Sequence, residues 1–97
     1  MNEELSPDEV RDRRLSRLHI LEGVQLAVDD RVNVVTAIGN SADKASARDA
    51  LMGQPWNLSE IQAAHVLDVP FSRVTQLGAA DLAAEVNELR SELERSI

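Results

Sequence analysis

The residues that could do chemistry in this 97-residue chain are few and scattered. Its two histidines, His19 and His65, lie far apart, and neither has a companion at the spacing of a metal site. Asp29 and Asp30 could form a carboxylate pair for acid–base work, but helix capping explains them more simply. The chain has no cysteine and no nucleophile-elbow or phosphate-loop motif. The sequence therefore predicts no catalytic residue, no cofactor and no metal site.

Two charged runs of opposite sign stand near the two ends of the chain. Residues 11–17 carry four arginines against one aspartate, and residues 85–94 carry four glutamates against one arginine. The arginines could form a phosphate-binding patch. We interpret them instead as partners of the glutamates, because two antiparallel terminal helices would place the runs side by side. Each exposed pair contributes at most about 1 kcal/mol, but the pattern favours one register.

The composition limits the classes of protein to which the chain can belong. Its formal net charge is -7, which disfavours general binding to nucleic acid or anionic membrane. Hydrophobic residues make up 43% of the chain, with one Phe, one Trp and no Tyr, so the core is aliphatic. No apolar run approaches the roughly 20 residues of a membrane helix, and the acidic start is unlike a secretory signal. We expect one cytoplasmic domain over residues 1–97, with residues 1–5 disordered and no membrane partner.

The two ends of the chain carry the clearest helix signals. Ser6 can cap a helix that begins at Pro7, with Glu9 three residues after the cap, and this helix should run to about Val28. The last helix should begin near Ala79. Its apolar residues recur at coiled-coil spacing, at Leu82, Val86, Leu89 and Leu93. These patterns predict an all-α fold in which two longer antiparallel terminal helices form a short coiled coil.

Three or four short helices are expected between the terminal ones. Residues 32–38 (VNVVTAI) favour a strand by propensity, but no partner strand is evident, so we predict a buried helix that ends at Gly39. Ser41 should cap a helix over residues 42–52, which ends at Gly53. Asn57 and Glu60 should cap a helix to Leu67. Pro70 should then separate it from a further helix that ends at Gly78.

Residues 60–77 (EIQAAHVLDVPFSRVTQL) also have the outline of a helix-turn-helix. A helix with Ala64 and Leu67 precedes the break at Pro70, and Val74 and Leu77 follow it. A small DNA-binding regulator is therefore an alternative function. Its weakness is electrostatic: the would-be recognition helix carries one cation, Arg73, whereas specific readers need several phosphate contacts. We expect no direct binding to nucleic acid.

Several segments, taken in order, resemble one known family. RLHILEG (residues 17–23), AVDDRVNVVTAI (27–38), ALM followed by PW (50–56), and EIQAAHVLDVPFSRVTQL (60–77) are similar to the A subunit of DNA gyrase and topoisomerase IV. The similar part is the tip of a coiled-coil hairpin that carries the exit gate, or C-gate. The helix from Leu82 to Leu93 corresponds to the returning arm. The resemblance covers roughly residues 13–95, and in this family residues 32–38 would be helical.

The resemblance implies a non-catalytic dimerisation module. The family's cleavage chemistry uses a tyrosine, and this chain has none. The implied partners are a second copy of the chain and a gyrase A subunit, with which a mixed dimer could modulate DNA topology. The large anchors of the interface would be Trp56 and Phe71, although both could equally belong to the core. The predicted interface comprises Trp56, Ile61, Ala64, His65, Leu67, Phe71 and Val74.

Three positions depart from the family's usual pattern. Arg31 stands where the family is usually apolar, and Pro70 where it is usually basic. His65 replaces a small alanine, and the larger side chain there could alter the choice of partner or face solvent.

Overall fold

A computed structural model describes residues 5–95 of the chain. Their secondary structure is entirely helical, which confirms the all-α prediction. The elements are α1 (Pro7–Asp29), α2 (Arg31–Gly39), α3 (Lys44–Met52), α4 (Glu60–Leu67), the 3-10 helix η1 (Phe71–Val74) and α5 (Gln76–Arg95). The disorder predicted for residues 1–5 falls mainly on residues 1–4, which lie outside the described range.

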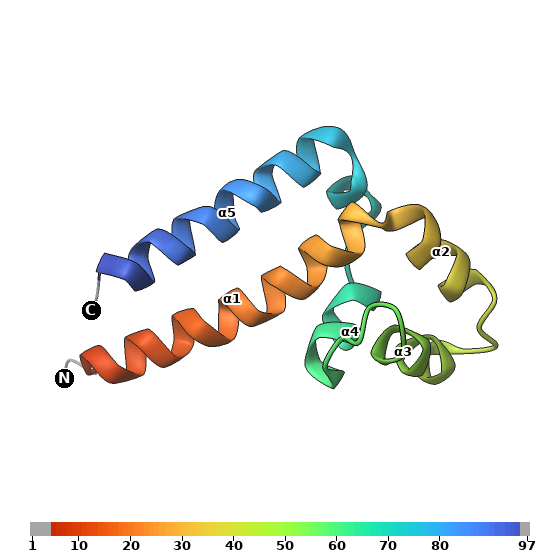
Figure 1. Ribbon diagram of the computed structural model, residues 1–97, viewed down its shortest axis with the longest axis horizontal. Helices are drawn as coiled ribbons and strands as arrows, with labels where there is room; N and C mark the ends of the chain where they lie inside the picture. The colour runs from red at the N-terminus through yellow and green to blue at the C-terminus, as the bar shows by residue number, and fades with distance from the viewer. Residues whose placement is uncertain (1–4, 96–97) are drawn as a thin grey trace.

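The two longest helices, α1 and α5, lie side by side and run antiparallel (Figure 1). Both ends of the chain are at one end of this pair, and α2, α3 and α4 gather at the other. We call the α1–α5 pair the arm, and residues 30–75, from Asp30 to Thr75, the tip. The radius of gyration, 15.2 Å, exceeds the roughly 12.5 Å expected for a compact chain of this length. The projecting arm accounts for the difference.

The cap predicted for α1 is present. The Ser6 hydroxyl accepts a hydrogen bond from the backbone N–H of Glu9 at 3.2 Å, and Pro7 occupies the first turn. On the second helix of the arm, the apolar stripe of α5 is buried as predicted. Leu82, Val86, Leu89 and Leu93 are all buried. The coiled-coil spacing thus identified the face of α5 that meets α1.

The core continues from the arm into the tip. Its buried cluster includes Leu21, Val24 and Val28 from α1, Val34 from α2, Leu51 from α3, Ala63 and Val66 from α4, and Leu82, Val86 and Leu89 from α5. Residues 32–38 are helical within α2, as predicted despite the β propensity of the valines, but the helix is not buried: Val34 enters the core, whereas Val32 and Val35 are exposed. Every α-helix of the described range therefore contributes to one aliphatic core.

Gly23 of α1 lies directly against Gln62 of α4. A Cβ atom at this position would lie 2.7 Å from Cβ and Cγ of Gln62. The Gln62 side chain also reaches α1, because its Nε2 donates to the backbone carbonyl of His19 at 2.7 Å. The glycine in the middle of α1 therefore permits a contact that joins the arm to the tip.

The caps predicted for α3 and α4 are wrong. α3 is capped by Asp43, whose carboxylate accepts from the Ser46 backbone N–H at 2.8 Å. Ser41 does not cap it, because its hydroxyl donates to the carbonyl of Ala37. The hydrogen bond from the backbone N–H of Ser46 lowers the pKa of the Asp43 carboxyl below its ordinary value, and the bond from the Ser46 hydroxyl adds to this effect.

The helix α4 is capped by Ser59 and Gln62, not by Asn57 and Glu60. The Ser59 hydroxyl accepts from the Gln62 backbone N–H at 3.2 Å, and the Gln62 Oε1 accepts from the Ser59 backbone N–H at 2.9 Å. An N-cap residue needs an extended backbone, and Ser59 has one. Asn57 has a φ of 52°, in the left-handed region, which excludes it from that role.

The segment after Pro70 also differs from the prediction. It forms a single 3-10 turn, η1, and α5 begins at Gln76 rather than near Ala79. Gly78 ends no helix. It lies in the first turn of α5, where its N–H donates to the Thr75 hydroxyl at 3.0 Å. A Cβ atom there would lie 2.7 Å from Cα of Arg73, so the glycine allows η1 to pack directly against α5.

Candidate functional site: an exposed apolar surface on the tip

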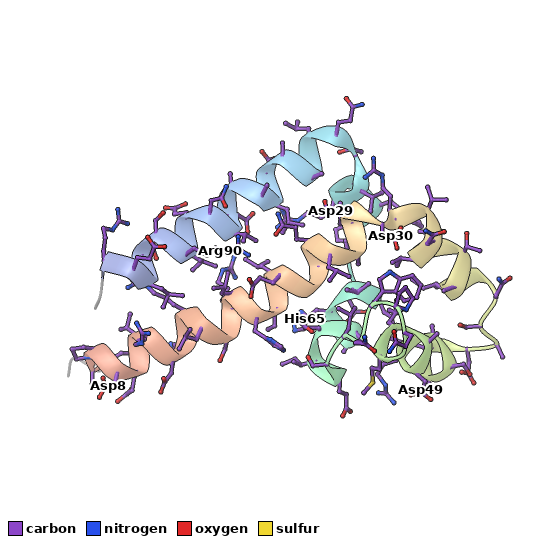
Figure 2. All side chains as sticks on the ribbon, viewed as in Figure 1. Asp8, Asp29, Asp30, Asp49, His65 and Arg90 are labelled. Carbon is purple, nitrogen blue, oxygen red and sulfur yellow. The ribbon has the colours of Figure 1, made fainter. Side chains whose placement is uncertain are left out.

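The charged runs of the arm pair with each other, as predicted. Nε of Arg14 lies 3.2 Å from a carboxylate oxygen of Glu92, and Nη2 of Arg17 lies 3.5 Å from Glu85. Arg90, the cation of the glutamate-rich run, lies 2.7 Å from Glu22 of α1. Figure 2 shows Arg90 reaching from α5 toward α1. Two of the four arginines in the run, Arg14 and Arg17, are thus paired with glutamates of α5, which favours the ion-pair interpretation over a phosphate patch.

The apolar surface of the molecule is concentrated on the tip and the start of α5. Within residues 5–95, the large hydrophobic side chains exposed in this region are Val32, Val35, Met52, Ile61, Phe71 and Leu77. Phe71 is 81% exposed, Val32 76% and Leu77 73%. Exposure of this extent is uncommon for residues of these types, and two of them, Val35 and Phe71, line the same groove, so this region is a candidate interaction surface. The exposed phenylalanine is also the only one in the chain.

The predicted interface residues differ in how far they are exposed. Ile61, His65 and Phe71 are exposed, and Ala64 is half-buried on α4. Leu67 and Val74 are half-buried and pack against the core. Trp56 is half-buried as well and also packs against the core. The surface residues Val32, Val35 and Leu77 were missed. For Val32 and Val35, the signal in the sequence was α2 itself, because a short helix with apolar residues on all sides cannot bury every one of them.

Trp56 and Phe71, which could not be assigned to core or surface from the sequence, have different environments. The indole Nε1 of Trp56 donates to the carboxylate of Asp30 at 2.9 Å. Asp30 lies at the junction of α1 and α2 (Figure 2) and also accepts from Asn33 at 2.8 Å. Its side chain makes no capping bond to the backbone of α2, which corrects the capping role predicted for it. Trp56 thus stabilises the tip from within, whereas Phe71 projects into solvent.

An apolar groove lies beside Phe71. It lies between the end of α1, the inner face of α2, the end of α4 and η1, and we call it the elbow groove. Its volume is about 180 Å³. The lining residues are Val24, Ala27, Val28, Arg31, Val34, Val35, Ile38, Val66, Leu67, Val69, Phe71 and Val74. Arg31 is the single charged member, and its guanidinium donates to the carbonyl of Val28 at 3.0 Å.

The two histidines occupy separate exposed positions. His19 Nε2 lies 2.8 Å from the Ser59 hydroxyl, beside the cap of α4. His65 lies on α4 (Figure 2). Among residues 5–95, no group of three or more His, Asp or Glu side chains is arranged to hold a metal ion. Ser59 is the cap of α4 and also accepts a hydrogen bond from the backbone N–H of Gln62, so the contact with His19 belongs to this cap.

The geometry disfavours the helix-turn-helix alternative. The would-be recognition helix is a four-residue 3-10 turn, too short to lie along a DNA groove. Its cation, Arg73, is also paired: Nη1 and Nη2 lie 3.2 and 3.1 Å from Glu85 of α5. An arginine held in this way inside the fold is not free to position a phosphate.

No helix formed within residues 5–95 has both the length and the apolar composition to cross a membrane.

Comparison with known proteins gives one consistent result. No protein-family model matches the chain. The A subunit of DNA gyrase from Campylobacter jejuni is 40% identical over 80 residues, which is 82% of this chain and 9% of that protein. The corresponding protein of Deinococcus deserti is 40% identical over 78 residues, and that of Synechocystis is 36% identical over 77. The chain spans about a tenth of the length of these curated relatives.

The chain is therefore related in sequence to one segment of the A subunit of DNA gyrase, and the resemblance found in its motifs is confirmed. The related stretch covers about four-fifths of this chain, so it includes most of the arm and the tip.

Proposed function

We propose that residues 1–97 form a single helical dimerisation domain, which pairs with a second copy through its tip and is similar to the C-gate in the A subunit of type II topoisomerases. The observation that carries the proposal is the apolar surface around Phe71, on a chain whose arm is already closed by its own leucines and ion pairs. The relation in sequence to the gyrase A subunit supports it. The predicted residues Ile61, Ala64, His65 and Phe71 belong to the proposed interface.

The proposed function is non-catalytic. The chain has no tyrosine or cysteine. Within residues 5–95, the conspicuous hollow is apolar and has no cluster of acids and bases around it. Binding rather than chemistry is what such a surface supports. We also propose a cytoplasmic location, which the relation to the gyrase A subunit supports.

The test is the mass of the protein in solution. Sedimentation at micromolar concentration should give twice 10.7 kDa. Phe71→Ser should leave the fold intact, because the side chain is 81% exposed, but should shift the equilibrium toward monomer. Leu15→Ser is the matched control, since Leu15 is also exposed but lies on the arm, and it should remain dimeric. A wild-type chain that stays monomeric would contradict the proposal.

We further propose that the same surface can pair with a gyrase A subunit, which would allow the chain to modulate DNA topology through a mixed dimer. The support is the relation between this chain and the corresponding segment of that protein. A tagged copy should co-purify with the host's gyrase A subunit, whereas Phe71→Ser should abolish the co-purification. Recovery of the homodimer alone would restrict the partner to a second copy.

A further inference from the structure

Phe71 and the elbow groove are complementary features on one face of the tip. The groove has a volume of about 180 Å³ and an almost wholly apolar lining. An apolar cavity of about 150 Å³ holds a benzene ring, so this groove can take one phenyl side chain. The only phenyl group in the chain stands on the rim of the groove, 81% exposed to solvent.

We propose that, in the dimer, the Phe71 ring of each copy enters the elbow groove of the other. This inference rests on the proposed function and goes beyond it by assigning the contact that joins the two copies. In a two-fold symmetric pair, if one copy's ring enters its partner's groove, the reverse contact forms as well. Because Phe71 itself lines the groove, both contacts fit within one continuous interface.

A second copy fits this groove better than an unrelated partner. For a reciprocal exchange, the partner must present an aromatic ring beside an apolar groove of its own. The chain itself has both features. Arg31, which also lines the groove, is held at the end of α1, because its guanidinium donates to the carbonyl of Val28. Exchange of the rings would bury both the exposed Phe71 and the exposed edge of Val35.

Two variants remove the two halves of the contact separately. Phe71→Ala removes the ring and keeps the groove. Val35→Trp keeps the ring and fills the groove, and the fold should tolerate it because Val35 is 49% exposed. Leu15→Trp is the matched control, since Leu15 is exposed to a similar degree, 43%, but lies on the arm. Circular dichroism establishes that each variant is folded.

The decisive measurement is complementation between the two variants. Loss of one buried aromatic anchor raises a Kd by about 30-fold, so each variant alone, which can form neither contact, should dimerise about 1,000-fold more weakly. A mixture of Phe71→Ala and Val35→Trp can form one ring-in-groove contact. The mixed dimer should therefore be about 30-fold tighter than either variant paired with itself, while Leu15→Trp should dimerise like the wild type.

The outcomes separate this inference from the proposed function. A monomeric wild type overturns both. A dimeric wild type in which the mixed dimer is no tighter than the variant pairs overturns the exchange alone, and would mean that the rings stack on each other or face elsewhere.

A second measurement needs no substitution that could unfold the chain. Copies carrying fluorinated Phe71 are mixed with copies labelled at their valine methyl groups, and magnetisation transfer between the two is recorded by NMR. Transfer from the ring to groove valines of the other copy supports the exchange. Its absence in a sample shown to be dimeric overturns it.

Discussion

The arm and the tip are built from similar aliphatic residues but use them differently. In the arm, Leu82, Val86 and Leu89 are buried against α1, and ion pairs such as Arg90–Glu22 border the seam. In the tip, α2 buries Val34 but leaves Val32 and Val35 exposed. The seam between the two arm helices is therefore buried within one chain, whereas α2 leaves part of its apolar surface exposed.

The difference follows from the length of the elements. The arm helices have 23 and 20 residues, which allows a continuous apolar stripe to pair along a partner of similar length. The helices of the tip have eight or nine residues and cannot shield every side of one another. The tip therefore has the most apolar surface to bury against a second chain. A chain of this size buries a smaller fraction of its surface when it folds alone than a larger protein does, so burial against a partner would add to its stability.

The largest expected effect comes from truncating the core in either region. Leu82 in the arm is 1% exposed and Leu51 in the tip is fully buried, and both belong to one buried cluster. Leu82→Ala and Leu51→Ala should each lower the free energy of unfolding by about 2–5 kcal/mol. Urea unfolding, followed by circular dichroism at one fixed protein concentration, measures both.

The comparison between these two variants tests whether the arm and tip are one cooperative unit. Because the cluster is continuous, each variant should unfold in a single transition. If Leu82→Ala loosened the arm and left a separate transition for the tip, the two regions would be independent, contrary to the continuous core. Leu15→Ala, at an exposed position on α1, is the control and should change the free energy by less than about 0.5 kcal/mol.

The contact between arm and tip at Gly23 should give the next largest effect. Alanine favours helix over glycine by about 1 kcal/mol, so Gly23→Ala would stabilise an isolated α1. In the folded chain the new Cβ would meet Cβ of Gln62 at 2.7 Å, and α4 would have to move away. We expect a net loss of about 1–3 kcal/mol, measured by thermal or urea unfolding.

The control for this substitution is Gly39→Ala. Gly39 ends α2, and no heavy atom lies within 4 Å of a Cβ built there. That variant should be neutral or slightly stabilising. Equal losses of unfolding free energy in the two variants would show that Gly23 and Gln62 are not in such close contact.

The arm could be predicted from the sequence in most respects, and for physical reasons. Its signals are long and repeated: a capped start at Ser6, apolar residues at coiled-coil spacing, and opposite charges at matching ends. Each repeat supports the others, so one misjudged residue would not alter the prediction. The pairing of Arg14 and Arg17 with glutamates follows from the same antiparallel register.

The tip could be predicted only in outline. Its three α-helices were predicted, but the helix expected after Pro70 is a 3-10 turn, and two caps were displaced, from Ser41 to Asp43 and from Asn57 to Ser59. Within two residues, several side chains could cap, and the backbone conformation selects among them. The exposure of Phe71 and the elbow groove depend on how four short elements meet, which local spacing does not encode.

The smallest expected effect concerns the ion pairs of the arm, and it decides what sets the register. Arg90 and Glu22 suit a double-mutant cycle, because Glu85 has two arginine partners and their contributions would be mixed. Arg90→Gln, Glu22→Gln and the double variant should give a coupling of about 0.2–1 kcal/mol, because the two side chains are 50% and 42% exposed. The coupling should shrink at high salt. A value well above that range, unaffected by salt, would mean that the ion pairs rather than the buried leucines hold α1 against α5. The contrast between the arm and the tip would then rest on charge rather than on burial.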